Sequence, residues 1–216
     1  MGSRTGEDAE APRDGSVPEA SVIILAGGES RRLALDKALL VLNGEWLLAR
    51  IVSTLAPLTD DLLVVANDTQ HLGRLAARIV PDVYPGTGPL GGIYAGLRAM
   101  RYERGLVVAC DMPLLNLGLL RYLIHVSCES EVVLPRIGDK TEPLHAVYTK
   151  TCLCAIEDSL KRGERRIIGF IPEVRVHYVE REEIEGFDPH HLSFFNINTR
   201  EELALARQLS GHGDWD

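Results

Sequence analysis

Short apolar runs alternate with helical stretches along most of this chain, and this alternation constrains the fold more than any other feature. Residues 21–26, SVIILA, are apolar on both faces, as expected of a central parallel strand. Residues 44–58 carry apolar side chains close to helical spacing, and they predict a helix that ends near Pro57. Strand and helix alternating in this way predict an α/β sandwich with a mostly parallel sheet.

The same pattern continues to the end of the last predicted helix. Further strands are predicted at residues 61–66, 78–83, 105–110, 131–137, 143–149 and 174–180. Further helices are predicted at residues 71–78, 93–103, 117–127, 150–163 and 199–209. Gly163 is a natural C-terminal stop, and Glu202 completes a capping box if Thr199 rather than Asn198 begins the last helix. Residues 85–92, PGTGPLGG, hold so many glycines and prolines that they predict a loop.

Composition narrows the possible partners. The 216 residues carry a formal net charge of −8, which argues against non-specific nucleic-acid binding because an acidic protein repels the phosphate backbone. No apolar run reaches about 18 residues, the length that a membrane-spanning helix needs. The four cysteines match no zinc-binding spacing, and they predict reduced thiols in a cytoplasmic protein.

The two ends of the chain differ in composition from the rest. Residues 1–20 are polar and rich in Gly, Pro and Glu, so we expect a disordered lead. Residues 21–209 hold all the predicted strands and helices, and they are expected to form a single domain followed by a flexible tail at 210–216. Parallel α/β sheets bind ligands beyond the carboxyl ends of their strands, and the candidate motifs below follow predicted strands.

A glycine turn and three cations follow the first strand. Gly27 and Gly28 lack a Cβ, so the backbone can turn sharply and aim amide groups at an anion. Arg31, Arg32 and Lys37 add positive charge that suits phosphate oxygens. The stretch predicts a polyphosphate site, although it matches neither the dinucleotide-binding fingerprint nor the P-loop. The alternative is an ordinary strand–turn–helix junction with surface cations.

Two further strand ends carry candidate ligand contacts. Residues 85–97, which include Gly91, suggest backbone brought close to a base or ribose, with a flexible connector as the alternative. Asp111 lies just past a buried strand, where a carboxylate facing a triphosphate is a natural Mg²⁺ ligand. Because Pro113 and Asn116 lie nearby, Asp111 could instead be a turn or helix-capping residue.

The remaining candidates lie in the C-terminal half. Asn196 and Asn198 are two residues apart, so in an extended segment both would point to one face and could reach a common ligand or metal. Helix capping is the alternative for Asn198. Residues 141–148, TEPLHAVY, which include Glu142, complete the set. The histidines form no recognisable cluster, and no Gly-x-Ser-x-Gly motif supports a serine hydrolase.

Taken together, these motifs resemble the molybdenum cofactor guanylyltransferase (MobA-like) family of nucleotidyltransferases. The matching stretches are LAGGESRRLALDKALL, PGTGPLGGIYAGL, CDMPLL, EPLHAVY, GERRI and FNINTREEL, and they follow the family's order. The resemblance implies a Rossmann-like three-layer sandwich of the nucleotide-diphospho-sugar transferase type. It also implies transfer of GMP from GTP to molybdenum-molybdopterin, with Mg²⁺ as the cofactor and pyrophosphate as the second product.

The resemblance and the motifs described above together predict roles for individual residues. Lys37, Asp111 and Arg32 would be catalytic, and Asp111 would be the metal ligand. Contacts to the second substrate would come from Glu142, Asn196 and Asn198. Contacts to the nucleotide would come from Leu25, Ala26, Gly27, Gly28, Lys37, Asn67, Asp82, Gly91 and Asp111. Molybdoenzymes and other cofactor-biosynthesis proteins are candidate partners.

One departure from the family's pattern leaves other readings open. Residues 33–35, Leu-Ala-Leu, follow Arg32 where the family usually has Met-Gly, so the loop could take a different path around the phosphates. A second reading is another Mg²⁺-dependent nucleotidyltransferase that uses CTP or a sugar phosphate. A third is a non-catalytic adaptor that binds a nucleotide or cofactor. The presence of both Lys37 and Asp111 favours an enzyme.

Overall fold

The computed structural model describes residues 19–26, 40–67 and 72–210 of the chain. Its main sheet has the strand order β10-β7-β9-β6-β1-β4-β5, and β8 pairs with β7. The strands are β1 Ser21–Leu25, β4 Leu62–Val65, β5 Arg78–Val80, β6 Arg104–Ala109, β7 Val132–Ile137, β8 Lys140–Thr141, β9 His145–Thr149 and β10 Val176–Val179. β1 pairs in parallel with both β4 and β6, whereas β9 is antiparallel to β6 and β7. The strand order therefore reverses at β1, which brings the carboxyl ends of β1 and β6 side by side.

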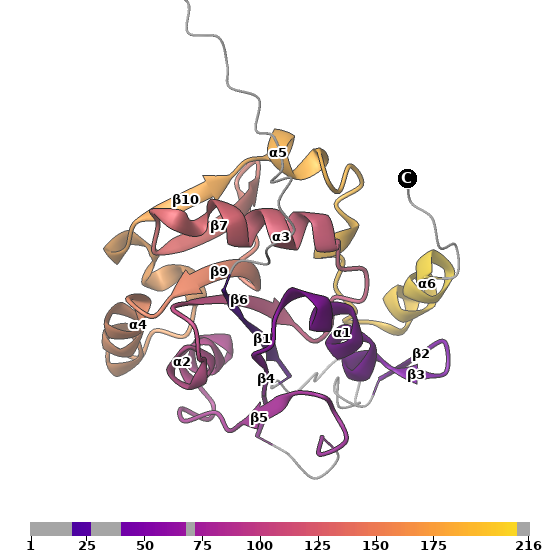
Figure 1. Ribbon diagram of the computed structural model, residues 1–216, viewed down its shortest axis with the longest axis horizontal. Helices are drawn as coiled ribbons and strands as arrows, with labels where there is room; N and C mark the ends of the chain where they lie inside the picture. The colour runs from indigo at the N-terminus through magenta and orange to yellow at the C-terminus, as the bar shows by residue number, and fades with distance from the viewer. Residues whose placement is uncertain (1–18, 27–39, 68–71, 211–216) are drawn as a thin grey trace, which may run out of the picture.

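Helices cover both faces of this sheet (Figure 1). α2 and α4 pack on one face, and α1, α3 and α6 pack on the other. The helices are α1 Leu47–Leu55, α2 Pro89–Ala99, α3 Leu117–His125, α4 Cys152–Lys161, α5 Arg181–Glu185 and α6 Arg200–Ser210. Five short 3₁₀ turns within the described ranges span Ala56–Leu58, Val126–Cys128, Ile167–Gly169, Ile171–Glu173 and Leu192–Phe194.

The central strand β1 contributes to both hydrophobic cores. Val22 and Ile24 are buried in the core on the α1 side. Ile23 and Leu25 are buried in the core on the α2 side. Burying one such side chain contributes roughly 1.5–3 kcal/mol, so a strand that is apolar on both faces is stable only between two helical layers. The predicted α/β sandwich with a mostly parallel sheet is confirmed.

All the predicted strands have a counterpart within a few residues, and most predicted helices do too. The last helix begins as its sequence suggests, because the Thr199 hydroxyl accepts the Glu202 amide and the Glu202 carboxylate accepts the Thr199 amide. Gly163, at a φ of 80°, follows the end of α4. No helix in the described ranges is both long enough and apolar enough to span a membrane. The predicted lead at 1–20 and tail at 210–216 lie almost entirely outside those ranges.

A two-stranded hairpin precedes α1 where the sequence pattern predicts the start of the helix. Its strands are β2 Val41–Leu42 and β3 Glu45–Trp46. Asn43 and Gly44 form the connecting turn, with φ values of 51° and 86°. Asn-Gly favours this two-residue turn because both positions need a positive φ. The helix therefore begins at Leu47 rather than at residue 44.

Two other predictions near the sheet edge are wrong. Residues 72–77 form turns instead of part of a helix at 71–78, because Arg78 pairs with Leu63 in the sheet and leaves too few residues for a stable helix. α2 begins at Pro89, inside the stretch predicted as a loop. Proline suits the first helical position, where its missing N–H has no intrahelical partner to lose.

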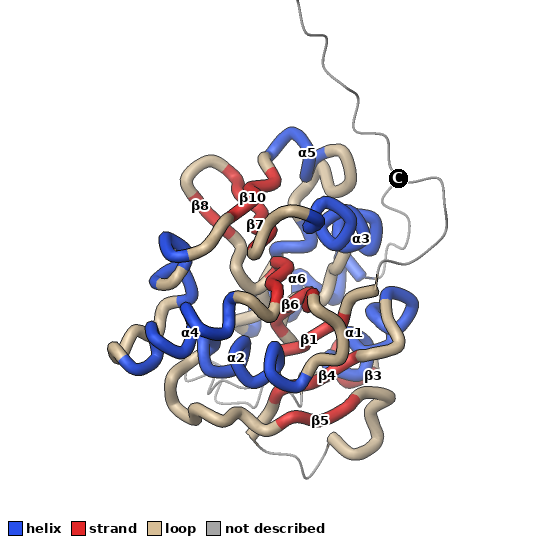
Figure 2. The backbone as a smooth tube through the Cα atoms, turned by 60° about the vertical axis from the view of Figure 1, so that its left-hand side comes forward, coloured by secondary structure: helices blue, strands red, loops and turns tan. Residues whose placement is uncertain are grey.

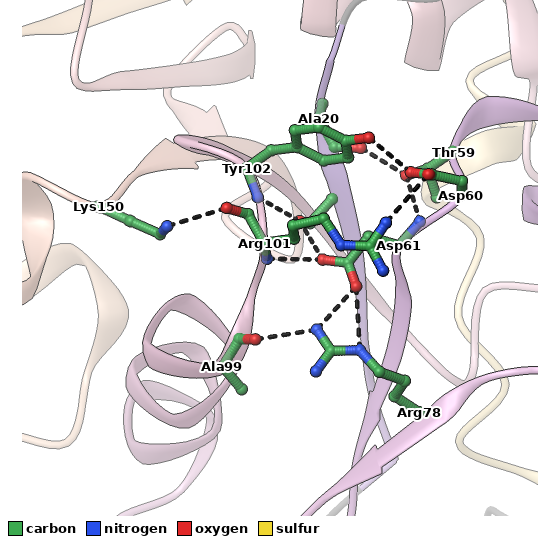
Figure 3. Close-up of polar contacts among 10 residues, drawn as sticks. Ala20, Thr59, Asp60, Asp61, Arg78, Ala99, Arg101, Tyr102 and Lys150 are labelled. Atoms are coloured by element: carbon green, nitrogen blue, oxygen red, sulfur yellow. Dashed lines mark hydrogen bonds and ion pairs between the residues drawn. The ribbon is translucent and has the colours of Figure 1, made fainter.

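A buried carboxylate joins the amino ends of β1, β4 and β5 (Figure 3). Asp61 is 1% exposed, and its Oδ2 accepts the Ser21 hydroxyl at 2.5 Å and the Arg101 amide at 2.7 Å. Its Oδ1 accepts the Arg78 guanidinium at 2.7 Å. Burial alone would raise the pKa of Asp61, but these donors together hold it below its ordinary value. This cluster lies at the edge opposite the strand carboxyl ends, so we assign it to the fold and not to a ligand site.

Candidate active site

Neighbouring strands end together at one edge of the sheet. The Cys110 amide donates to the Leu25 carbonyl at 3.1 Å, and the Ala26 amide donates to the Val65 carbonyl at 2.9 Å. These bonds continue the ladders one residue past β1 and β6. Leu25 is buried with its side chain on the α2 side, and Ala26 is buried on the α1 side. Both predicted residues therefore lie at the centre of the edge where open parallel sheets bind ligands.

Asp111 lies immediately beyond this edge, one residue after the backbone contact made by Cys110. It is 9% exposed, and its carbonyl accepts a 2.9 Å hydrogen bond from the Ile197 amide. Helix capping at this loop is performed by Asn116, whose Oδ1 accepts the Leu119 amide at 2.9 Å. The capping role that the sequence left open for Asp111 is therefore filled by another residue.

The segment that carries Asn196 passes directly beside Asp111. Asn196 precedes Ile197, the residue that donates to the Asp111 carbonyl. The Asn196 side chain donates through Nδ2 to the Phe194 carbonyl at 3.0 Å, which holds it against its own segment. The structure thus brings a predicted contact to the second substrate next to the predicted metal ligand.

Asn198 lies between this segment and α6. Its backbone amide donates to the Glu202 carboxylate at 2.6 Å. Since the Thr199 hydroxyl accepts the Glu202 amide at 3.1 Å, Thr199 is the residue whose side chain caps the helix. The capping alternative for the Asn198 side chain is therefore wrong, and its predicted contact to the second substrate remains a prediction.

The loop between β5 and α2 is held in shape by its own groups. Asp82 Oδ1 accepts the Tyr84 amide at 2.8 Å, and the Thr87 hydroxyl donates to the Tyr84 carbonyl at 2.6 Å. A Cβ on Gly91 would lie 2.1 Å from Thr87 Oγ1 and 2.9 Å from the Tyr84 carbonyl oxygen. Gly91 is thus required for the packing of this loop on α2. Asp82 follows β5 and the exposed Asn67 follows β4, so both lie on the β4 side of β1.

His145 joins several segments on the other side of β6. It begins β9, pairs with Val108, and its amide donates to the Glu142 carbonyl at 3.0 Å. Its ring is fully buried and lies edge-on to the Phe194 ring, with centroids 4.9 Å apart. Neither ring nitrogen finds a hydrogen-bond partner in the described part of the chain. Burial lowers the pKa of His145 to about 3, so the imidazole is neutral at physiological pH.

Glu142 lies beside the same edge, just before β9. Its amide donates to the Pro135 carbonyl at 3.0 Å, which continues the pairing of β7 with β8. β8 lies at the end of the sheet farthest from β5 (Figure 2). Burial raises the pKa of the Glu142 carboxyl, and the nearby Lys140 charge offsets part of that rise. The structure therefore places this predicted residue on the Asp111 side of β1, away from Asn67 and Asp82.

The cationic part of the predicted site lies outside the described residues. This part comprises Gly27, Gly28, Arg32 and Lys37, together with the unusual Leu-Ala-Leu stretch at 33–35. In contrast, His145 was not among the predicted site residues although it contacts two of the segments that carry them. In the sequence, His145 is visible only as a titratable residue in an alternating strand pattern. Such a pattern predicts neither that the imidazole is buried nor which side chain it contacts.

One carboxylate at this edge is compatible with Mg²⁺. Within residues 19–26, 40–67 and 72–210, no three His, Cys, Asp or Glu side chains gather into a metal site. Mg²⁺ does not need such a cage, because it commonly binds one or two carboxylates together with substrate phosphates and waters. Asp111, placed where the strand order reverses, fits that requirement.

Comparison with known proteins identifies the family. Residues 22–177 match the family model described as the MobA-like NTP transferase domain. The chain belongs to the MobA-like NTP transferase family. As a MobA-like protein it is a nucleotidyltransferase, and the family resemblance of its motifs is confirmed.

Two curated relatives align with this MobA-like chain over nearly its whole length. A probable molybdenum cofactor guanylyltransferase of Pelotomaculum thermopropionicum is 39% identical over 192 residues, which cover 89% of this chain and 94% of the relative. A molybdenum cofactor guanylyltransferase of Syntrophotalea carbinolica is 36% identical over 190 residues, which cover 87% of this chain and 90% of the relative.

Solved structures support the same fold. Molybdopterin-guanine dinucleotide biosynthesis protein A from Archaeoglobus fulgidus superposes with a TM-score of 0.79 at 28% identity, covering 88% of this chain and 98% of that one. The 2-C-methyl-D-erythritol 4-phosphate cytidylyltransferase from Thermus thermophilus superposes with a TM-score of 0.69 at 18% identity, covering 89% and 99%. At that identity the second match supports the fold alone.

Proposed function

We propose that this protein transfers GMP from GTP to molybdenum-molybdopterin, giving the molybdopterin guanine dinucleotide cofactor and pyrophosphate. The two relatives described above are named for this activity. The structural observation that carries the proposal is the position of Asp111, where the strand order reverses and where Ile197 holds the Asn196 segment against it. A candidate metal ligand and a candidate acceptor contact thus meet at one edge.

The reaction needs positioning more than acid–base chemistry. The acceptor is a phosphate monoester that is already ionised at neutral pH, so one of its oxygens attacks the α-phosphorus of GTP without a general base. The bond from that phosphorus to the oxygen bridging to the β-phosphate breaks, and pyrophosphate leaves with the electron pair. The protein's contribution is to hold the two anions in line and to offset their charge.

The two substrates approach from opposite sides of β1 in this proposal. Asn67 and Asp82 serve the nucleotide on the β4 side. Asn196, Asn198 and Glu142 serve the acceptor on the β6 side, and Gly91 keeps the loop that carries Asp82 in place. Leu25 and Ala26 form the floor between the two sides.

Charge neutralisation completes the site. Mg²⁺ held by Asp111 and by phosphate oxygens would reduce the repulsion between the two phosphate groups. Arg32 and Lys37 would stabilise the leaving pyrophosphate, a role that rests on their place in the glycine motif. Glycines 27 and 28 would bring backbone amides to the same phosphates.

The proposed reaction also implies the protein's partners and cellular compartment. Its substrates are small molecules, so neither nucleic acid nor a membrane surface takes part. Molybdoenzymes and other cofactor-biosynthesis proteins are the partners that would receive the product or supply the acceptor. We place the reaction in the cytoplasm, in keeping with Cys110, Cys152 and Cys154, none of which forms a disulfide.

Pyrophosphate release tests the proposal. Purified protein would be given Mg²⁺ with GTP, CTP, ATP or UTP, each with and without molybdenum-molybdopterin. The proposal predicts release with GTP only when the acceptor is present, together with a guanine dinucleotide product detected by mass spectrometry.

The other readings predict different results in the same assay. Release with CTP in preference to GTP would make the protein a cytidylyltransferase, and release with a sugar phosphate in place of the pterin would change the acceptor class. Nucleotide binding, seen as a raised melting temperature, without any pyrophosphate would support the non-catalytic adaptor.

A further inference from the structure

Glu142 has a rigid backbone and an unused carboxylate. Its amide donates to the Pro135 carbonyl at 3.0 Å, and its carbonyl accepts the His145 amide at 3.0 Å. Within the described residues, no side chain or backbone amide donates a hydrogen bond to its carboxylate. The Glu142 side chain is only partly buried, so its carboxylate stays open to water and to a ligand that offers hydrogen-bond donors.

The register of the strands places this carboxylate on the acceptor side. Residues directly opposite one another in paired strands share a face of the sheet, and Glu142 is opposite Pro135. Pro135 in turn pairs with Val179, which lies in the core on the α3 side. The Phe194 ring packs on this same core, so Glu142 shares a face with the segment that leads to Asn196.

The chemistry of the acceptor limits what a carboxylate can bind there. A phosphate or a molybdenum–dithiolene group is anionic and would be repelled. The pterin ring is different, because its 2-amino-4-oxopyrimidine edge presents a ring N–H beside an exocyclic amino group. Two such parallel donors match the two oxygens of a carboxylate, in the same way that a guanidinium does.

We propose that the Glu142 carboxylate binds the 2-amino-4-oxopyrimidine edge of the pterin acceptor through two parallel hydrogen bonds. This inference rests on the proposed function, since it names the part of the second substrate that the site recognises. Guanine presents the same pair of donors, so GTP is the other possible source of this edge. The structure favours the pterin because Asn67 and Asp82, the candidate nucleotide contacts, lie across β1 from Glu142.

The test compares Glu142→Gln with two other variants. Glu142→Gln replaces one acceptor oxygen by a donor, and Glu142→Asp keeps the carboxylate on a shorter arm. Asp139→Asn is the matched control, because Asp139 is exposed in the turn of the same hairpin. For each protein, the KM values for GTP and for molybdenum-molybdopterin would be measured from pyrophosphate release, together with the melting temperature.

We expect Glu142→Gln to raise the KM for molybdenum-molybdopterin by about 10- to 100-fold, the range for lost hydrogen bonds to a charged group. The KM for GTP and the preference for GTP over ITP, which lacks the 2-amino group, should stay within twofold. Glu142→Asp should recover part of the loss, and Asp139→Asn should match wild type. The melting temperature of Glu142→Gln should equal or exceed that of wild type, because a desolvated charge has been removed.

Three outcomes would overturn the proposal. An unchanged KM for the acceptor in Glu142→Gln would reject the contact while leaving the guanylyltransferase activity intact. A raised KM for GTP with a collapsed preference over ITP would assign Glu142 to guanine instead. Wild-type protein that releases no pyrophosphate from GTP and molybdenum-molybdopterin would reject the proposed function, and this inference with it.

Discussion

The Ile197 amide donates a 2.9 Å hydrogen bond to the Asp111 carbonyl, which joins two segments that lie far apart in the sequence. Ile197 is completely buried and Asp111 nearly so. The bond therefore fixes the Asn196 segment at the carboxyl end of β6. The geometry of the proposed acceptor side follows from this contact together with the packing of Phe194 on His145.

A substitution at Gly91 should disturb the nucleotide side. In Gly91→Ala the new Cβ would collide with Thr87 Oγ1 and the Tyr84 carbonyl, at 2.1 and 2.9 Å. Backbone must shift to relieve the second contact, at a cost of about 1–3 kcal/mol for overpacking. We expect the dissociation constant for GTP, measured by calorimetry, to rise at least about tenfold because Asp82 moves with the loop.

Gly73→Ala is the control for this prediction. Nothing lies within 4 Å of a Cβ at Gly73, so this variant should bind GTP as wild type does. Equal GTP affinity in the two variants would show that the shape of the loop does not matter for the nucleotide.

Asp61→Asn should weaken the fold without changing the chemistry. The amide nitrogen of asparagine cannot accept the bonds that the carboxylate takes from Ser21, Arg101 and Arg78, and an unmatched buried group costs about 1–3 kcal/mol. The midpoint of urea unfolding should therefore fall, while turnover per folded molecule stays the same. Asp60→Asn, whose ion pair with Arg101 is exposed, should change the midpoint little.

The same variant has a predictable pH dependence. The folded-state pKa of Asp61 lies below its ordinary value of 3.8, so its stabilising contribution is present above that value and is lost as pH falls toward the folded-state pKa. Wild type should consequently lose stability faster than Asp61→Asn below about pH 4. Parallel acid-unfolding curves for the two proteins would contradict the assigned role of the carboxylate.

His145→Leu should make the protein more resistant to acid. The pKa of His145 falls from 6.5 to about 3 on folding, so between these values the unfolded chain binds a proton that the folded chain excludes. Wild type therefore loses about 1.4 kcal/mol of stability per pH unit in that window, and the leucine variant does not. Chemical denaturation at pH 7, 6, 5 and 4 measures this difference.

His190→Leu is the control because His190 is exposed. This variant removes an imidazole from the surface and keeps the buried His145 ring, so the loss of stability between pH 6.5 and pH 4 should persist. If His145→Leu also runs parallel to wild type below pH 6.5, the imidazole is not held neutral in the folded protein.

The alternation of apolar runs with helical stretches predicts the strands well. A parallel strand that is buried on both faces needs apolar side chains at nearly every position, so it stands out in the sequence. It predicts the direction of β9 less well, since that direction depends on the tight turn and short β8 that precede it. It also places the start of α2 too late, because glycines 91 and 92 look like loop residues in the sequence, although Gly91 lies in the helix and lacks room for a side chain there.

For the site, the sequence predicts residues at strand ends but not how they are held. Asp111 and Asn196 are visible as polar residues after apolar runs, and the structure places Asp111 at the carboxyl edge of the sheet, where the rule for open parallel sheets predicts a ligand. The Ile197 bond and the burial of His145 depend on how distant segments pack, which no local pattern encodes. The cationic loop with Arg32 and Lys37 lies outside the described residues, so its part of the prediction is still to be tested.

The most direct test of the account is GMP transfer by Asp111→Asn beside Asp139→Asn, using GTP labelled at the α-phosphate and molybdenum-molybdopterin. Label in the guanine dinucleotide product would be followed over time, with melting temperatures measured on the same samples. The account predicts that Asp139→Asn matches wild type, whereas Asp111→Asn is slower by about 10²–10³-fold per folded molecule, the size of effect expected when charge stabilisation in the transition state is lost. A rate for Asp111→Asn within tenfold of wild type would contradict it.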